Sequence, residues 1–275
     1  MIDMQGKVID GQPAEIDQAE ILIVFCRHGE TEANRMGIIQ GSGIDFPLTE
    51  CGVDDARRTG NALKVTGLQV WDGLFTSPLK RAVNTARILA SSSGVHCDDI
   101  EEVDILRERG AGVLEGQYVS TTIEEAKRYV AEKTGISIQQ VDNSAYESEA
   151  DVCRRQKELI NFIKGRKFRN GAKILCISHG AYIRLFLKHN CSTPIETFVD
   201  NCSLTCVRLL TSTVGDGYTC IPQIVNDTDH LYVPSEADEN LIAFERGNEI
   251  TGMQSTMEWI RDYEAFCANP KTFTL

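Results

Sequence analysis

Short apolar runs alternate with amphipathic stretches along most of the chain. Residues 21–26 and 173–178 are continuous apolar runs, a pattern that predicts strands buried on both faces. Four further segments have weaker strand patterns: residues 74–76, 103–106, 204–210 and 218–225. The spacing between these segments leaves room for a helix in most of the gaps.

Helix start signals occupy those gaps. Thr49 precedes a helical stretch to about residue 65, and Ser77-Pro78 predicts a helix to about residue 90, with Ser as N-cap and Pro at the first helical position. Thr121 with Glu124, and Ser148 with Asp151, resemble capping boxes and predict helices near 122–133 and 149–164. Alternating strands and helices indicate an α/β fold with a largely parallel sheet.

Both ends of the chain fall outside this alternation. We expect residues 1–20 to form a flexible extension and residues 232–275 to form a C-terminal extension with a short helix after Ser255. Two stripes follow from helical spacing there: Met257, Ile260 and Glu264 in one, and Trp259, Tyr263 and Phe266 in the other. Such stripes are typical of a helix that docks on the chain's own core, and a surface for a partner is the alternative.

The composition excludes several classes of function. The net charge of −12 argues against a general nucleic-acid binder, because contacts to phosphate backbones need clustered positive charge. No apolar run approaches the length of a membrane span, and the polar, acidic start lacks the features of a secretory signal, so we expect a cytoplasmic protein. The ten cysteines show no zinc-binding spacing and are expected to be free thiols, Cys26 among them in a buried strand. Nothing in the sequence indicates an oligomeric state.

Two of the five histidines share a setting. His28 follows the strand at 21–26 within Arg27-His28-Gly29-Glu30, and His179 follows the strand at 173–178 within Ser178-His179-Gly180. Each lies at the carboxyl end of a predicted central strand, which is the edge where open α/β sheets bind ligands. Helix N-termini after the glycines favour an anion there. A histidine satisfied within the core is the alternative for either one alone.

These segments resemble the motifs of the histidine phosphatase (phosphoglycerate mutase-like) superfamily, branch 1. The likeness extends through four places: Arg27 to Thr31 with Asn34, Ser77 to Ala86, Leu106 to Arg109 with Gly112, and Ser178 to Gly180. Within it the chain is most similar to TIGAR-type fructose-2,6-bisphosphatases. The resemblance implies a three-layer α/β/α sandwich over residues 21–231, in which about 107–150 form a cap over the site.

The resemblance also implies roles for particular residues. His28 would be the nucleophile that forms a phosphohistidine, with its second ring nitrogen donating to a backbone carbonyl. Arg27 and Arg81 would hold the phosphoryl oxygens, because a planar guanidinium suits bidentate contact. His179, expected to be protonated, would stabilise the transition state, and Glu108 would act as general acid and then base, which requires a pKa raised towards neutrality. No metal and no cofactor are implied.

Substrate contacts are expected from a second set of residues, named here together: Asn34, Gln40, Gly41, Gly180, Ala181 and Arg109. A second phosphate could meet any of five cations: Arg109, Lys127, Arg128, Arg154 and Arg184. Glu30 is expected to cap a helix, to orient Arg81 or to take part in catalysis. Gly110-Ala111 and Tyr146 depart from the family pattern near the substrate mouth, so they bear on specificity and not on the chemistry.

The leading interpretation is a phosphatase of small phosphorylated metabolites, with fructose 2,6-bisphosphate as the best single substrate. A phosphoglycerate or bisphosphoglycerate mutase and a phosphatase of broad specificity are alternatives within the enzymes. A binding module built on a catalytically inactive copy of the fold is the alternative outside them. All five core positions of the family are intact, which argues against the binding module: Arg27, His28, Arg81, Glu108 and His179.

Overall fold

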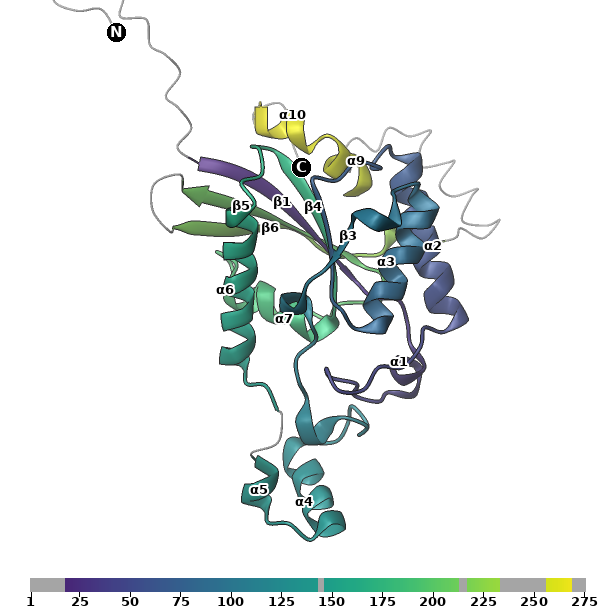
Figure 1. Cartoon of the computed structure of the whole chain (residues 1–275), viewed down its shortest axis with the longest axis vertical. Helices are drawn as coiled ribbons and strands as arrows, with labels where there is room; N and C mark the ends of the chain where they lie inside the picture. Colours follow the sequence, from purple (N-terminus) through teal and green to yellow (C-terminus); the bar gives the residue numbers. More distant parts are fainter. Residues whose placement is uncertain (1–17, 143–145, 213–216, 233–255, 269–275) are drawn as a thin grey trace, which may run out of the picture.

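A six-stranded sheet runs through the middle of the computed structural model, which describes residues 18–142, 146–212, 217–232 and 256–268 (Figure 1). The strands are β1 (Gln18–Arg27), β2 (Gly73–Thr76), β3 (Ile100–Glu102), β4 (Ala172–Ser178), β5 (Leu204–Ser212) and β6 (Tyr218–Asp227). Their order across the sheet is β3-β2-β4-β1-β5-β6. The first four strands in that order are mutually parallel, and β5 is antiparallel to both of its neighbours.

The two strongest strand predictions form the centre of this sheet. β1 and β4 lie side by side with Ile21 opposite Ala172 and Arg27 opposite Ser178. Ile23 and Ile174 are fully buried, as a strand covered on both faces requires. Because the two strands run in parallel and in this register, the residues that follow them, His28 and His179, emerge together at one edge of the sheet.

Helices cover both faces of the sheet and complete a three-layer α/β/α sandwich, which confirms the predicted fold class (Figure 1). One face packs against α6 (Glu149–Gly165) and α7 (Gly180–His189). The other packs against α2 (Glu50–Val65), α3 (Lys80–Ser93), α9 (Thr256–Arg261) and α10 (Tyr263–Ala268). The remaining helices are α1 (Glu32–Met36), α4 (Ile123–Thr134) and α5 (Ile138–Asp142), with 3-10 turns η1 (Cys97–Asp99), η2 (Asp104–Leu106), η3 (Gly112–Leu114) and η4 (Asp229–Leu231).

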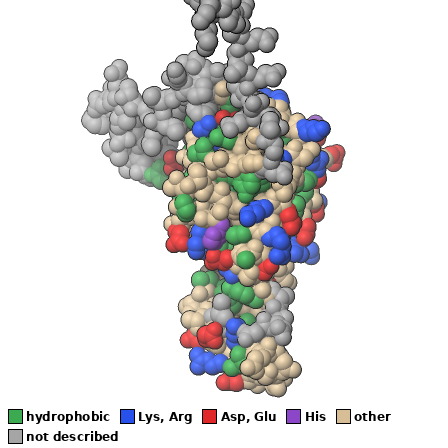
Figure 2. Space-filling view, turned by 90° about the vertical axis from the view of Figure 1, so that its left-hand side faces the viewer, with side chains coloured by type: hydrophobic (Ala, Val, Ile, Leu, Met, Phe, Trp, Pro, Cys, Tyr) green, Lys and Arg blue, Asp and Glu red, His purple; other side chains and the backbone are tan. Residues whose placement is uncertain are grey.

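α4 and α5 project from the sandwich at one end and make its narrow lower part in Figures 1 and 2. In the face shown in Figure 2, basic and acidic side chains are interspersed over the surface. No helix in the described ranges is long and apolar enough to span a membrane.

Two of the predicted element boundaries are wrong. Residues 103–106 are not a strand: β3 ends at Glu102, and Asp104–Leu106 form the turn η2. The chain turns here because Val103 N donates to Thr76 O at the sheet edge and the Leu106 carbonyl then accepts from Ser178 Oγ at 2.8 Å. The turn directs residue 108 back across the sheet edge.

The second wrong boundary is at Ser77-Pro78. α3 begins at Lys80 with Leu79 as N-cap, so Pro78 does not occupy the first helical position. The Ser77 hydroxyl is hydrogen-bonded to His179 Nε2 at 2.7 Å, which places it in the site. Two of the other start signals are confirmed, since Thr49 and Ser148 both accept from the helix they precede.

The capping box of α4 lies one residue later than predicted. Thr122 and Glu125 make both of its hydrogen bonds, whereas Thr121 and Glu124 were expected to make them. A shift of one residue is within the ordinary uncertainty of a helix start read from a pattern.

The C-terminal helices pack on the chain's own core. Trp259, Ile260 and Tyr263 are buried against the sheet face that α2 and α3 also cover. Tyr263 donates to Glu20 Oε1 at 2.7 Å, and Arg208 binds the same carboxylate through Nε and Nη2. Of the two interpretations of this segment, docking on the core is therefore the one that the structure shows. Residues 1–17, Ser255 and the side chains of Met257, Glu264 and Phe266 lie outside the described parts.

Candidate active site

The two central strands bring the predicted histidines into contact. The rings of His28 and His179 lie 5.1 Å apart between centroids and are tilted by 60°. Both side chains are buried, and the backbone N–H of His28 donates to Ser178 O at 3.0 Å. Parallel pairing of β1 with β4 therefore positions both rings, as the sequence predicts.

The proton of His28 can be assigned from its neighbours. Arg81 Nε donates to His28 Nε2 at 3.3 Å, and because a guanidinium has only donors, Nε2 is the ring nitrogen with the lone pair. The proton is then on Nδ1, which donates to Gly29 O at 2.8 Å. Burial, then Arg81 and Arg27, hold the pKa of His28 well below its ordinary value. The ring is therefore neutral, with a nucleophilic nitrogen beside two guanidinium groups.

Arg81 is fixed by the loop that follows α1. It is 1% exposed and donates to Gly41 O at 2.7 Å, to Ile44 O at 3.1 Å and to Asp45 Oδ1 at 3.1 Å. Every arm of the guanidinium thus has a partner, so its Nε is held against His28. A side chain this constrained loses little conformational entropy when it binds an oxyanion.

Arg27 is held from the opposite side. Its Nη1 donates to Val199 O, and the Phe198 ring lies 5.8 Å from Cζ. Its Nε is buried and has no hydrogen-bond partner within the described ranges. A buried donor without a partner is costly, so Arg27 offers a strong site for an oxygen acceptor.

His179 lies behind His28 with its Nε2 on the Ser77 hydroxyl. Burial, then Arg81, His28 and Arg27, hold its pKa well below the ordinary value. Burial and two guanidinium groups thus disfavour a protonated His179 in this arrangement, whereas the predicted positive charge concerns the transition state with a phosphoryl group bound. Its Nδ1 is buried and also finds no partner among the residues described.

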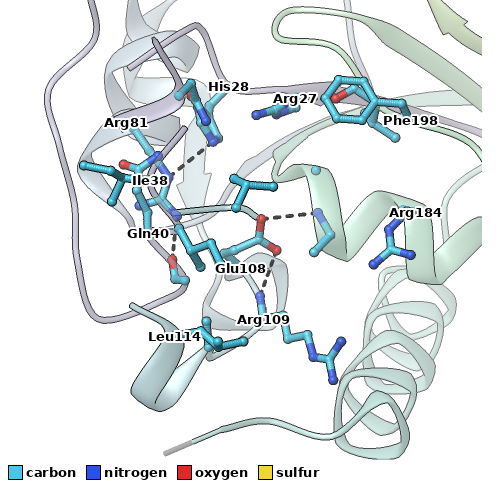
Figure 3. A pocket seen from close by; sticks show the side chains of 18 of the residues that line it. Arg27, His28, Ile38, Gln40, Arg81, Glu108, Arg109, Leu114, Arg184 and Phe198 are labelled. Carbon is cyan, nitrogen blue, oxygen red and sulfur yellow. Dashed lines mark hydrogen bonds between the residues drawn. The ribbon is translucent and has the colours of Figure 1, made fainter. Parts of the chain in front are cut away.

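Glu108 reaches the site from the loop that follows η2. Its carboxylate accepts from Arg109 N at 2.8 Å, Tyr182 N at 3.1 Å and Ala181 N at 3.3 Å (Figure 3). The last two donors belong to the first turn of α7, so the helix N-terminus holds the carboxylate in place. The backbone N–H of Ala181 is predicted to contact substrate, but in the structure it donates to the Glu108 carboxylate.

Arg155 supports the loop that carries Glu108. Its guanidinium donates to both oxygens of Glu147, at 2.6 and 2.7 Å, and to the carbonyls of Ile105 and Arg107, at 2.9 and 3.0 Å. Glu147 in turn accepts from Gly110 N at 3.1 Å. This ion pair therefore spans both ends of the segment 105–110, and the sequence analysis did not identify it.

A cavity of about 400 Å³ lies between Arg27, His28, Arg81 and Glu108 (Figure 3). All the predicted site residues line it except His179, which is covered by its neighbours. Among the five candidates for a second phosphate, Arg109 and Arg184 line the cavity, whereas Lys127, Arg128 and Arg154 do not. Arg154 instead pairs with Asp151 at 2.9 Å.

Residues 23–214 match the family model described as "Histidine phosphatase superfamily (branch 1)". The chain belongs to this superfamily. Its members are phosphatases or mutases of small phosphorylated compounds, and the positions of His28, Arg27 and Arg81 suit that chemistry.

Two relatives and one solved structure illustrate the likeness. "Fructose-2,6-bisphosphatase TIGAR B" of Danio rerio is 29% identical over 197 residues, covering 61% of this chain and 73% of its own. "Phosphoglycerate mutase-like protein 4" of Arabidopsis thaliana is 31% identical over 221 residues, covering 79% and 89%. The phosphoglycerate mutase structure from Bacillus anthracis has a TM-score of 0.58 at 22% identity and covers 78% of this chain and 96% of that one. At that identity the structural likeness shows the fold alone.

Besides Ala181, three predicted substrate contacts are already engaged by other groups of the protein. Gln40 donates to Thr31 Oγ1 at 2.8 Å and accepts from Phe46 N at 3.2 Å, so both ends of its amide are used. Gly41 has a φ of +56° and supplies its carbonyl to Arg81. Arg109 donates to Tyr146 Oη and to Glu147 O, both at 2.7 Å. These residues shape the cavity of the phosphatase fold.

Asn34 and Gly180, the other two predicted substrate contacts, also line the cavity. The Asn34 Oδ1 accepts from Thr31 N and Oγ1, which leaves the amide NH₂ as the end suited to a phosphoryl oxygen. A Cβ at Gly180 would lie 3.3 Å from Arg27 Nε, so a small residue is needed there.

Several partners were not predicted because they are distant in sequence. Asn201 donates to His28 O at 2.8 Å, and Glu115 holds the loop after Gly41 through Ser42 N at 3.1 Å. Glu30 accepts from Thr49 Oγ1 at 2.7 Å, so it supports the start of α2 and not Arg81.

No group of three or more histidine, cysteine or acidic side chains suited to a metal ion occurs in residues 18–142, 146–212, 217–232 and 256–268. Burial raises the pKa of the Cys26 thiol to about 12, which keeps this site neighbour in its unreactive thiol form. The guanidinium groups of Arg27 and Arg81 supply positive charge at the site.

Proposed function

We propose that this protein is a phosphatase that works through a phosphohistidine at His28. The observation that carries the proposal is the Nε2 lone pair of a neutral, buried imidazole held between Arg81 and Arg27. Nε2 attacks phosphorus, and the bond from phosphorus to the substrate oxygen breaks. Arg27 and Arg81 offset the charge on the equatorial oxygens, as phosphoryl transfer requires.

Glu108 completes the two half-reactions in this proposal. Its protonated carboxyl donates to the departing alkoxide, which leaves as the alcohol. The resulting carboxylate then accepts a proton from water while the water oxygen attacks the phosphohistidine. The N–P bond breaks, inorganic phosphate leaves, and the His28 lone pair and the Glu108 proton are restored.

His179 would respond to the phosphoryl group. In the arrangement described, the two arginines hold its pKa low. A phosphoryl dianion bound between Arg27 and Arg81 would reverse that local charge and favour the protonated ring. His179 would then carry the positive charge that the sequence interpretation assigns to it, but only while phosphate is bound.

The segment 107–150 would act as a cap within a catalytic domain of residues 21–231. Glu108, Arg109, Leu114, Val119 and Tyr146 line the cavity from this segment. Cap residues would exclude bulk water from the first half-reaction and admit one water molecule in the second. Extensions at 1–20 and 232–275 would lie outside this domain.

Fructose 2,6-bisphosphate is the substrate we propose first. The likeness to the TIGAR B relative supports it, and Arg109 and Arg184 lie in the cavity beyond the phosphoryl site. A mutase is the second candidate, supported by the phosphoglycerate mutase-like relatives. A mutase would have to protect the phosphohistidine from water and return the phosphoryl group to substrate.

The test is phosphate release from a panel: fructose 2,6-bisphosphate, 2,3-bisphosphoglycerate, phosphoenolpyruvate, 3-phosphoglycerate and p-nitrophenyl phosphate. His28→Ala should lose at least about 10³-fold in kcat/KM while it keeps its folded circular dichroism spectrum. His96→Ala is the matched control, because His96 is exposed and does not line the cavity.

Each outcome of the panel is informative. A clear preference for fructose 2,6-bisphosphate that depends on His28 supports both mechanism and substrate. Release from several compounds keeps the mechanism and rejects that substrate. No release from a folded protein rejects the phosphatase, and conversion of 3-phosphoglycerate to 2-phosphoglycerate would then identify the mutase. Inactivity in both assays would favour the binding module.

A further inference from the structure

The cavity changes character between its floor and its mouth. Its floor is charged and buried, with Arg27, His28 and Arg81 at 9%, 2% and 1% exposure. Four apolar side chains also line the cavity, those of Ile38, Leu114, Val119 and Phe198, which we call the apolar rim. Ile38, Leu114 and Phe198 are labelled in Figure 3. Val119 and Phe198 are 69% and 70% exposed. Large apolar side chains exposed together at the mouth of a polar site mark a surface that a ligand covers.

Part of the apolar rim is held in place by backbone pairing. Three hydrogen bonds of 2.7 to 2.9 Å join the loop after α1 to the segment after η3. They run from Val119 N to Gly37 O, from Gly116 N to Ile39 O and from Ile39 N to Gln117 O. An isolated antiparallel bridge pairs Ile38 with Tyr118 in the same place. This short ladder connects the loop after α1 to the segment after η3. A ligand would therefore meet Ile38 and Val119 already ordered, which reduces the entropic cost of covering them.

Two guanidinium groups, those of Arg109 and Arg184, also line this outer level. Arg109 is occupied by Tyr146 and Glu147, and its guanidinium lies over the Tyr146 ring at 4.8 Å. Because the acceptors, Tyr146 Oη and the Glu147 carbonyl, are neutral, Arg109 keeps its positive charge, as does Arg184. The outer cavity thus offers an apolar surface as well as two guanidinium groups to whatever is attached to the phosphoryl group.

We propose that the site also hydrolyses phosphomonoesters whose organic group is apolar, such as primary alkyl phosphates, with that group lying against the apolar rim. This rests on the phosphohistidine chemistry proposed above and adds a second substrate class to the bisphosphate. The reaction is unchanged: His28 Nε2 bonds to phosphorus, the ester P–O bond breaks, and Glu108 protonates the departing alkoxide. Each methylene buried on the rim removes apolar surface from water, worth about two- to fourfold in binding.

A homologous series isolates this contribution. Ethyl, n-butyl and n-hexyl phosphate share a primary alcohol leaving group, so the chemical step is matched and only apolar length varies. We expect kcat/KM to rise at least about tenfold from ethyl to hexyl phosphate. A polar ester of similar length, 2-(2-hydroxyethoxy)ethyl phosphate, should stay near the ethyl value. A flat series, or equal rates for the polar and apolar esters, overturns the proposal.

Matched variants locate the effect. Val119→Ser should reduce the ratio of hexyl to ethyl kcat/KM at least about threefold, because it replaces apolar rim surface by a hydroxyl. Val65→Ser is the control: Val65 is 86% exposed at the end of α2 and does not line the cavity, so the ratio should not change. Equal ratios in Val119→Ser and wild type would reject the rim as the cause.

A binding measurement separates failure of this inference from failure of the proposed function. Hexylphosphonate and ethylphosphonate cannot be hydrolysed, and calorimetric titration compares their affinities without turnover. If no ester is hydrolysed but hexylphosphonate binds at least about tenfold more tightly, the rim is supported and the phosphatase is rejected. If ethyl phosphate is hydrolysed and the two phosphonates bind equally, the phosphatase stands and the rim proposal is overturned.

Discussion

Replacement of Arg155 by Met should destabilise the protein and displace the Glu108 loop. The side chains of Arg155 and Glu147 are only 12% and 20% exposed. Removal of the guanidinium leaves Glu147 and the carbonyls of Ile105 and Arg107 without their donor. Breaking a buried ion pair costs about 3–5 kcal/mol, and the partial exposure of this one puts the estimate at the lower end, about 3 kcal/mol.

Thermal unfolding measures this loss. A change of about 3 kcal/mol should lower Tm by about 6–12 °C in a domain of this size. Arg154→Met is the matched control, since the neighbouring Arg154 is 68% exposed in its pair with Asp151 and should cost no more than about 0.5 kcal/mol. Equal Tm values for the two variants would refute the reasoning.

The pH dependence of the same variant provides a second check. Burial raises the pKa of Glu147, but the Arg155 hydrogen bonds and charge outweigh it and hold that pKa below its ordinary value of 4.5. A lowered folded-state pKa gives stability above pH 4.5 that is lost as the pH falls through the folded value. The difference in the free energy of unfolding between wild type and Arg155→Met should therefore become smaller in acid. A difference in the free energy of unfolding that stays constant from pH 7 to 3 would contradict the assignment of the lowered Glu147 pKa to Arg155.

Arg155 is a positioning residue, and its effect on turnover should differ from a general loss of folding. At a temperature where both variants are fully folded, Arg155→Met should lower kcat about 10-fold or more through the displaced Glu108. Arg155→Lys, which keeps the positive charge on a single donor nitrogen, should recover part of it. The pH profile of kcat should shift in Arg155→Met. An unchanged profile with unchanged kcat would limit Arg155 to a purely structural role.

Three further predictions follow from other contacts. Gly60→Ala should lower Tm by several degrees in a melting scan, because its Cβ would lie 2.4 Å from Leu89 O where α2 meets α3; an unchanged Tm would contradict that packing. Burial raises the pKa of Glu20, but Arg208 and Tyr263 hold it below 4.5, so wild type should lose more stability than Glu20→Gln between pH 7 and 3.5 in urea titrations. Turnover should persist in excess EDTA, since guanidinium groups supply the positive charge in the proposed mechanism; loss of activity there would refute it.

The centre of the fold could be predicted because its signals are local. The apolar runs that became β1 and β4 need no distant partner to be recognised, and their parallel pairing brings His28 and His179 together without further information. β3 was misplaced because a three-residue edge strand is too short for a periodic pattern. The start of α3 was misplaced because Ser77 makes its hydrogen bond to His179, a residue about a hundred positions away.

The details of the site depended on such distant contacts. Nothing near Gln40 in the sequence indicates that both ends of its amide are taken up by Thr31 and Phe46. The charge of His179 depends on burial together with Arg81 and Arg27, which only the assembled fold brings around it. The motifs thus identified which residues meet, whereas burial and hydrogen bonding decide the protonation state and free donors of each.

The sheet order has a consequence for how the chain acquires its structure during synthesis. β1 ends at Arg27, yet its neighbours β4 and β5 begin at Ala172 and Leu204. At about 5–20 residues per second, the ribosome needs roughly 7–30 s to make the stretch between β1 and β4. For that time β1, whose residues 21–26 are buried in the folded protein, has neither edge paired, a state prone to intermolecular strand addition. Newly made chains should therefore depend on a chaperone that holds β1 until β4 emerges, and His28 gains its surroundings only after that point.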